Sequence, residues 1–402
     1  MHASGHVLFI VAAALLTEGA AHGKTGHVES MRTTSEIFER TILSKSYHID
    51  RKYKSMMGPK SSQKIKLITS HPSFNEKEPE LLWIIGYRAT MMNGNGNEQA
   101  SQEFMCHSNL NFQPRDYQEN FRSNVSMSGR LFTLSQGQQQ IDFPEGYGIP
   151  VMSDMDLDLA TQVLNLNITK SKLDVRHKVM IRFVRDSEVH GHMKPLFQAA
   201  VQGFKSLEEQ PGHYGISMEE TDGHEGCGIG LPAVMDNVRK DEFGQKFTGH
   251  WIVKPGREVN TTLVTEWLQL QFDTTIHYIA VHLHPFAESL ELLDKTTGKS
   301  LFKAHARNRL NKIGIEHINH FESIKGIKIY KDHDYELVSI YNNTSGEDQD
   351  SMAVMYLYLH DQNFKKPSGH PNPWWVAGSA VILIFTMSLW LSWHRKQKRP
   401  LY

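Results

Sequence analysis

Two histidines separated by one residue, His282 and His284, end an apolar stretch that reads His-Tyr-Ile-Ala-Val-His-Leu-His. Residues i and i+2 of a strand point to the same face, so both imidazoles can converge on one ion. His277, five residues before His282, faces the other side of a regular strand. The pair predicts a transition-metal site; the alternative is two half-buried histidines that hydrogen-bond to their neighbours.

A methionine strengthens the prediction. Met352 lies near the start of the last predicted strand, which runs from Asp350 to Leu359. Thioether and imidazole ligands together favour copper, particularly Cu(I), over magnesium or calcium. A methionine in a strand also commonly fills space in a core, which is the alternative role for Met352. The predicted metal ligands are therefore His282, His284 and Met352, with copper as the cofactor.

The motifs His282-Leu-His284 and Asp350-Ser-Met352 resemble those of the copper type II, ascorbate-dependent monooxygenases, which include peptidylglycine α-hydroxylating and dopamine β-monooxygenases. The resemblance covers about residues 65–362 and is most specific over the C-terminal half. It implies two tandem sandwiches and a copper that activates dioxygen and attacks a C–H bond of a small-molecule or peptide substrate. It also implies ascorbate or another external reductant.

The sequence departs from that family at the second, electron-storing copper. Where the family has adjacent histidines, this chain has Cys106-His107, and Leu164 stands where the third ligand is expected. That site is therefore lost or rebuilt. The candidates for a rebuilt site are His107, Cys106, His190 and His192, and the alternative is that the last two are solvated loop histidines.

The chain has 23 His but only two Cys, Cys106 and Cys227. That count excludes cysteine-rich zinc modules. In an oxidising compartment the two cysteines are expected to form one disulfide, and their Cα separation decides whether they can.

Both ends of the chain look like targeting or anchoring segments. Residues 1–23 read as a signal peptide, with a ten-residue apolar run, Val7–Leu16, followed by small residues. Residues 374–393 carry no charge and have Trp at both ends, as a transmembrane helix does. The basic residues of 394–402 predict a cytoplasmic tail. We therefore expect a single-pass membrane protein with an extracytoplasmic ectodomain, in the secretory pathway or at the cell surface, or facing the periplasm in a bacterium.

The composition indicates a globular ectodomain. Hydrophobic residues make up 39% and charged residues 22%, and the formal net charge of −1 gives no support for nucleic-acid binding. Acceptor sequences for N-glycosylation occur at Asn124, Asn167, Asn260, Asn342 and Asn343 and predict a glycoprotein in a eukaryotic host.

Short strands rich in β-branched and aromatic residues predict a mainly β fold. We expect two tandem jelly-roll-like β-sandwich domains, one C-terminal transmembrane helix, and β-hairpins around Lys295–Gly298 and Lys331–Asp334. The predicted segments are a signal peptide (1–23), a lead-in (24–62), an N-terminal sandwich (63–204), a connector (205–248), a copper-binding sandwich (249–362), the helix (374–393) and the tail (394–402).

Three functions fit these observations. The first is a copper-dependent monooxygenase, an oxidoreductase that hydroxylates an organic C–H bond. The second is a membrane-tethered copper carrier or sensor without catalysis. The third is an adhesion-type β-sandwich with incidental histidines. Copper-dependent oxygen consumption with ascorbate separates the first from the second, and no copper affinity in equilibrium dialysis would favour the third.

Overall fold

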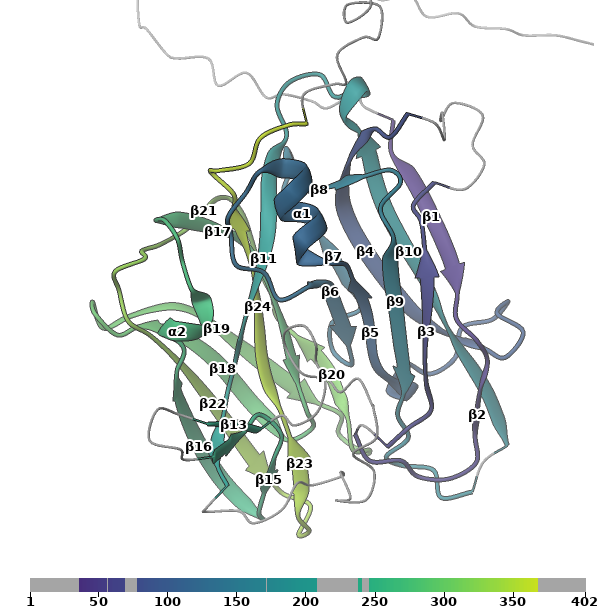
Figure 1. The fold of residues 1–402 in the computed structure, drawn as a ribbon. Coiled ribbons are helices and arrows are strands. Elements are labelled where there is room, and N and C mark those ends of the chain that lie inside the picture. Colours follow the sequence, from purple (N-terminus) through teal and green to yellow (C-terminus); the bar gives the residue numbers. More distant parts are fainter. Residues whose placement is uncertain are drawn as a thin grey trace, which may run out of the picture. The chain divides into compact units, whose positions relative to one another are not determined.

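The computed structural model describes residues 36–55, 57–68, 78–170, 172–207, 238–240 and 246–367, all within one compact unit, Thr33–Tyr402. These residues are mainly β and form several sheets, which confirms the mainly β part of the predicted fold class (Figure 1). The predicted signal peptide, transmembrane helix and cytoplasmic tail lie outside the described residues, as do Cys227 and most of the connector. Among the described residues, no helix combines the length and apolarity needed to cross a membrane.

The largest sheet described has ten strands and runs through both halves of the chain. Its main path follows the order β1 (Phe38–Leu43), β10 (Leu173–Arg185), β4 (Leu81–Asn93), β8 (Tyr147–Met152), β11 (Lys194–Gln202), β24 (Ala353–His360), β17 (Thr274–Leu283) and β21 (Phe321–Ile329). Beside that path, β2 (Tyr47–Ile49) pairs with β10 and β7 (Gln140–Asp142) pairs with β4. Within this sheet β8 and β11 pair in parallel, whereas the other pairs are antiparallel.

A four-stranded sheet packs against the N-terminal part of the large sheet, with β5 next to β10 and β6 next to β4. Its order is β3 (Lys60–Ile65), β9 (Leu157–Val163), β5 (Met105–Asn111) and β6 (Arg130–Ser135). The short helices are η1 (Gln102–Phe104), α1 (Pro114–Phe121), η2 (Asp186–Glu188) and α2 (Thr265–Leu268).

The C-terminal half adds a five-stranded sheet of β16 (Gly256–Leu263), β22 (Tyr335–Asn343), β18 (Ala287–Asp294), β19 (Lys299–Asn308) and β20 (Ile315–Ile318). A smaller sheet joins β15 (Trp251–Val253) to β23 (Gln349–Ser351). Another contains β12 (Lys205–Ser206), β14 (Lys246–Thr248) and β13 (Val238–Lys240).

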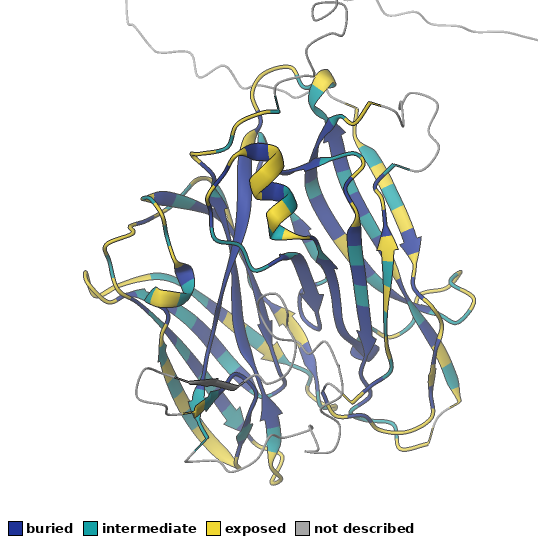
Figure 2. Cartoon of the chain, viewed as in Figure 1, coloured by how far each residue is buried: buried dark blue, intermediate teal, exposed yellow. Residues whose placement is uncertain are grey.

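The burial of each strand follows its position in the layers (Figure 2). Along β22 the odd-numbered residues are buried and the even-numbered ones are half exposed, as a strand with one face on the core requires. By contrast, β24 is buried on both faces over seven of its eight residues, because it lies between β11 and β17 at the centre of the large sheet. The core is therefore densest where the two halves share a sheet.

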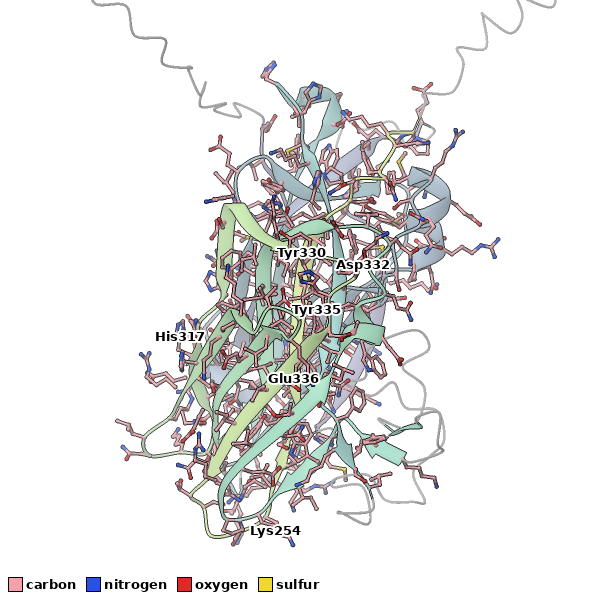
Figure 3. All side chains as sticks on the ribbon, turned by 90° about the vertical axis from the view of Figure 1, so that its left-hand side faces the viewer. Lys254, His317, Tyr330, Asp332, Tyr335 and Glu336 are labelled. Carbon is pink, nitrogen blue, oxygen red and sulfur yellow. The ribbon has the colours of Figure 1, made fainter. Side chains whose placement is uncertain are left out.

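One predicted hairpin is confirmed and one is wrong. Strands β18 and β19 pair in antiparallel register around Lys295–Gly298. The chain around Lys331–Asp334 instead leaves β21, which pairs with β17, and enters β22, which pairs with β16 and β18. Tyr335 fixes this corner, because its hydroxyl donates to Tyr330 O and accepts from Tyr330 N (Figure 3). The residues Lys331–Asp334 therefore carry the chain from one sheet to another and do not close a hairpin within one sheet.

Candidate metal centre

Three buried side chains from distant parts of the sequence meet in the C-terminal half. The ligand atoms of His250, His284 and Asp350 all lie within 4.8 Å of one another. Asp350 Oδ2 is 3.2 Å from His250 Nε2 and 3.0 Å from His284 Nδ1, so one carboxylate oxygen lies between two imidazoles. Two imidazole nitrogens and a carboxylate are a set that suits transition metals such as copper and zinc.

Strand pairing brings the carboxylate to the first histidine. β15 pairs with β23, with Ile252 opposite Asp350, and His250 directly precedes β15. Thr248 holds the backbone of His250 at both ends: its hydroxyl accepts from His250 N at 3.1 Å and donates to His250 O at 2.8 Å. The short sheet of β15 and β23 therefore fixes two of the three groups (Figure 1).

A buried tyrosine ties the third group to the same strand region. The Tyr341 hydroxyl accepts from His284 N at 3.2 Å and donates to Met352 O at 2.6 Å. Burial raises the pKa of Tyr341, so the hydroxyl keeps its proton and its donor role. Tyr341 thereby links the end of β17 to the chain between β23 and β24.

The electrostatics of the cluster favour a negative carboxylate. Burial by itself would raise the pKa of Asp350, but the His284 charge and the hydrogen bonds from His250 and His284 bring it well below its usual range. Nδ1 of His250 is buried and makes no hydrogen bond within the described residues. The cluster thus offers the ionised carboxylate of Asp350. It also offers Nδ1 of His250, which has no hydrogen-bond partner among the described residues.

The sequence-predicted ligands lie around this cluster. The ring of His282 is 5.2 Å from that of His284, centroid to centroid, and both side chains are buried. Met352 is fully buried two residues after Asp350. His277 lies elsewhere: its ring stacks on Tyr147 at 4.1 Å and its Nδ1 is 3.0 Å from Ser323 O.

The four candidates for a second metal site are not gathered in one place. His107 and Cys106 are buried in β5, and Cys106 Sγ is 3.9 Å from Gln162 Oε1. His190 and His192 are exposed in the segment between η2 and β11. Within the described ranges, the group of His250, His284 and Asp350 is the one in which three such ligand atoms come together. The predicted disulfide from Cys106 reaches Cys227, which lies outside those ranges.

Sequence reasoning missed His250 and did not treat Asp350 as a ligand. His250 stands alone between Gly249 and Trp251, with no second ligand type at metal-binding spacing. Its partner is a hundred residues away, and only the pairing of two three-residue strands brings the two together. The sequence showed Asp350 two residues before Met352, but it gave no sign that Asp350 lies beside His250.

The comparisons with known proteins return no family. No family model and no curated protein match the chain. A solved structure that matches is the major capsid protein P2 from bacteriophage PM2, with 8% sequence identity and a TM-score of 0.30, covering 82% of this chain and 100% of that chain.

The comparisons do not support the family prediction. No family model matches the chain, so the predicted membership in the copper type II, ascorbate-dependent monooxygenases is corrected: the chain is not assigned to that family. The functions drawn from that resemblance, a copper monooxygenase or a membrane-tethered copper carrier or sensor, lose their support with it. The physical reason is the brevity of the pattern: a His-x-His pair and one distant Met are few residues, and a strand places residues i and i+2 on one face whatever the protein does.

Proposed function

We propose that this chain is a metal-binding β protein in which one buried transition-metal ion cross-links the C-terminal strands through His250, His284 and Asp350. The observation that carries the proposal is the convergence of these three ligand atoms within 4.8 Å in the interior. The ion would join the short sheet of β15 and β23 to the end of β17. Its contribution would be stability, because an ion that binds only the folded chain adds binding free energy to folding.

Copper is the ion we propose. A site with two imidazoles and one oxygen follows the general affinity order, in which Cu²⁺ exceeds Zn²⁺ and the earlier divalent metals. His282 and Met352, the ligands predicted from the sequence, are also buried, and they form the alternative ligand set that the variants below test. The finer fold we propose is two tandem jelly-roll-like sandwiches that share the strands β11, β24 and β17, which the ten-stranded sheet supports.

Equilibrium dialysis of the purified full chain against Cu²⁺, with Zn²⁺ as competitor, tests the proposal. We expect one ion per chain. His250→Gln and Asp350→Asn should each weaken binding about 100-fold or more, since loss of an outer partner alone costs 10- to 100-fold. The matched control is His333→Gln, which breaks a His–Asp pair (Nδ1 to Asp294 Oδ2, 2.8 Å) that lies outside the cluster and should not change binding.

Two further variants decide which ligand set is used. His282→Gln and Met352→Leu should leave the affinity within a fewfold if His250, His284 and Asp350 hold the ion. Equal losses in these two variants, with an unaffected His250→Gln, would instead identify the ligands predicted from the sequence. Absence of bound copper or zinc in the folded native chain would refute the proposal.

A further inference from the structure

A separate cavity of about 260 Å³ lies in the C-terminal half. It is lined by the residues before and at the start of β18, by the turn between β19 and β20, and by the end of β22. Its size suits a small organic molecule rather than a peptide or a nucleotide. Pro285, which follows His284, is part of its wall.

The wall of the cavity holds an unusual backbone conformation. Phe286 has a φ of 71°, in the left-handed region that bulky residues rarely adopt. Its N–H donates to Asn308 Oδ1 at 2.7 Å, its carbonyl accepts from Asn342 N at 2.8 Å, and Asn308 Nδ2 donates to Ala287 O at 2.8 Å. Asn308 and Asn342 also line the cavity. Strained residues that are held by several bonds concentrate at binding and active sites.

Among the described residues around the cavity, one cation has no ion pair. Glu288 pairs with Arg257 at 3.0 Å, and Lys312 pairs with the buried Glu103 at 3.1 Å. Arg309 has no ion pair in the part of the chain that the structure describes, and its Nε is buried there without a hydrogen-bond partner. A buried guanidinium nitrogen without an acceptor is costly unless a ligand supplies one.

Gly314 packs against the Arg309 side chain at the cavity wall. A Cβ added at Gly314 would lie 3.0 Å from Gln136 Oε1, 3.3 Å from Arg309 Cδ and 3.5 Å from Arg309 Nε. A side chain at position 314 would therefore press first on Gln136 and then on the Arg309 stem.

We propose that this cavity binds a small organic carboxylate, with the carboxylate on Arg309 and the apolar body against Phe286 and Ile313. Arginine presents a planar fork of N–H donors that matches a carboxylate with two parallel hydrogen bonds. Phe286, Pro285 and Ile313 provide apolar wall, and Asn308 and Asn342 are polar residues of the lining. The proposal goes beyond the metal site and does not depend on it.

Equilibrium dialysis of benzoate against the metal-free full chain is the test, with benzyl alcohol as the neutral ligand of matching shape. We expect benzoate to bind more tightly than benzyl alcohol, and Arg309→Met to weaken benzoate binding about 10- to 100-fold, the usual size for a charged hydrogen bond. Arg309→Lys keeps the charge without the fork and should lose part of the affinity. Arg307→Gln removes an exposed arginine that pairs with Glu316 and should have no effect.

Three results would overturn the carboxylate site: no benzoate binding to the folded chain at millimolar concentration, equal affinity for benzyl alcohol, or unchanged binding in Arg309→Met. Benzoate binding to Asp350→Asn separates the two sites. It should persist there even if the metal site is lost, and its disappearance in that variant alone would show that benzoate binds through the metal centre.

Discussion

The two halves of the molecule each bury histidines, but in opposite electrostatic settings. In the N-terminal half, His177 of β10 is fully buried, and burial together with the nearby His107 lowers its pKa to about 3, against a smaller opposing effect of the Gln162 backbone. In the C-terminal half, His250 and His284 share the ionised Asp350. A buried imidazole without a carboxylate remains neutral, whereas a pair with one provides a place for a cation.

The difference shows why counting histidines predicts so little. His177 lies on β10 facing the core, with its ring 6.2 Å from that of Tyr47, and neither ring nitrogen makes a hydrogen bond of normal geometry within the described residues. In the part of the chain that the structure describes, no carboxylate forms a ligand group with His177 and His107. The carboxylate, rather than the imidazole, is what distinguishes the two regions.

The largest effect should come from removing that carboxylate. Asp350→Asn removes the negative charge between two buried imidazoles and breaks a buried charge pair, so we expect the metal-free chain to lose about 3–5 kcal/mol of unfolding free energy. Urea denaturation in the presence of a chelator measures it. His333→Gln, whose ring is partly exposed, should cost clearly less. Equal losses in both variants would mean that Asp350 contributes no more to stability than an ordinary, partly exposed His–Asp pair.

Acid should act on the N-terminal half through His177. Its folded pKa is about 3, below the ordinary 6.5, so the unfolded chain takes up the proton first as the pH falls. The stability that the neutral ring contributes is complete above pH 6.5 and is lost toward pH 3. The loss of unfolding free energy that His177 causes between pH 7 and pH 4 is about 3 kcal/mol.

His177→Leu should therefore flatten the fall of the urea midpoint between pH 7 and pH 4. The control is His317→Leu, at an exposed position on β20 that is labelled in Figure 3, which should leave the pH dependence as it is. An unchanged slope in His177→Leu would mean that other groups dominate the acid response.

A smaller effect should come from the ion pair between the two regions. Lys312 Nζ lies 3.1 Å from Glu103, whose side chain is only 6% exposed, and Asn167 exchanges two hydrogen bonds with the backbone of Ile313 beside it. Lys312→Gln should lower the unfolding free energy by about 1–2 kcal/mol, because it leaves a buried carboxylate without its cation. Calorimetry would show whether the two halves still unfold together. Arg115→Gln, which breaks a fully exposed pair with Glu119, should change nothing measurable.

The smallest expected effect concerns the exposed histidines. His190→Ala combined with His192→Ala should leave the copper stoichiometry of the chain unchanged, because these side chains are exposed and, among the described residues, belong to no group of three ligand atoms. Metal analysis of the purified variant measures it. A loss of one ion per chain would support the second metal site that was predicted from the sequence.

Much of the β architecture was readable from the sequence. The alternation of apolar and polar residues in β22 and the continuous apolar run of β24 report which strands face water and which lie at the centre of a sheet. The neighbourhood of His282 and His284 follows from the two-residue period of a strand. Which sheet each strand joins did not follow, as the corner at Lys331–Asp334 shows, because a turn sequence fixes local geometry and not the pairing beyond it.

By itself, the sequence determined the mainly β class and one buried imidazole pair, since both depend on residue type and spacing of two along a strand. Only the tertiary structure decided that His250 and Asp350 complete the cluster and that Arg309 lines a cavity with no ion pair to another described residue. These arrangements depend on contacts between segments far apart in the chain. The register of β15 on β23 places His250 beside a carboxylate a hundred residues away, and no local pattern encodes that register.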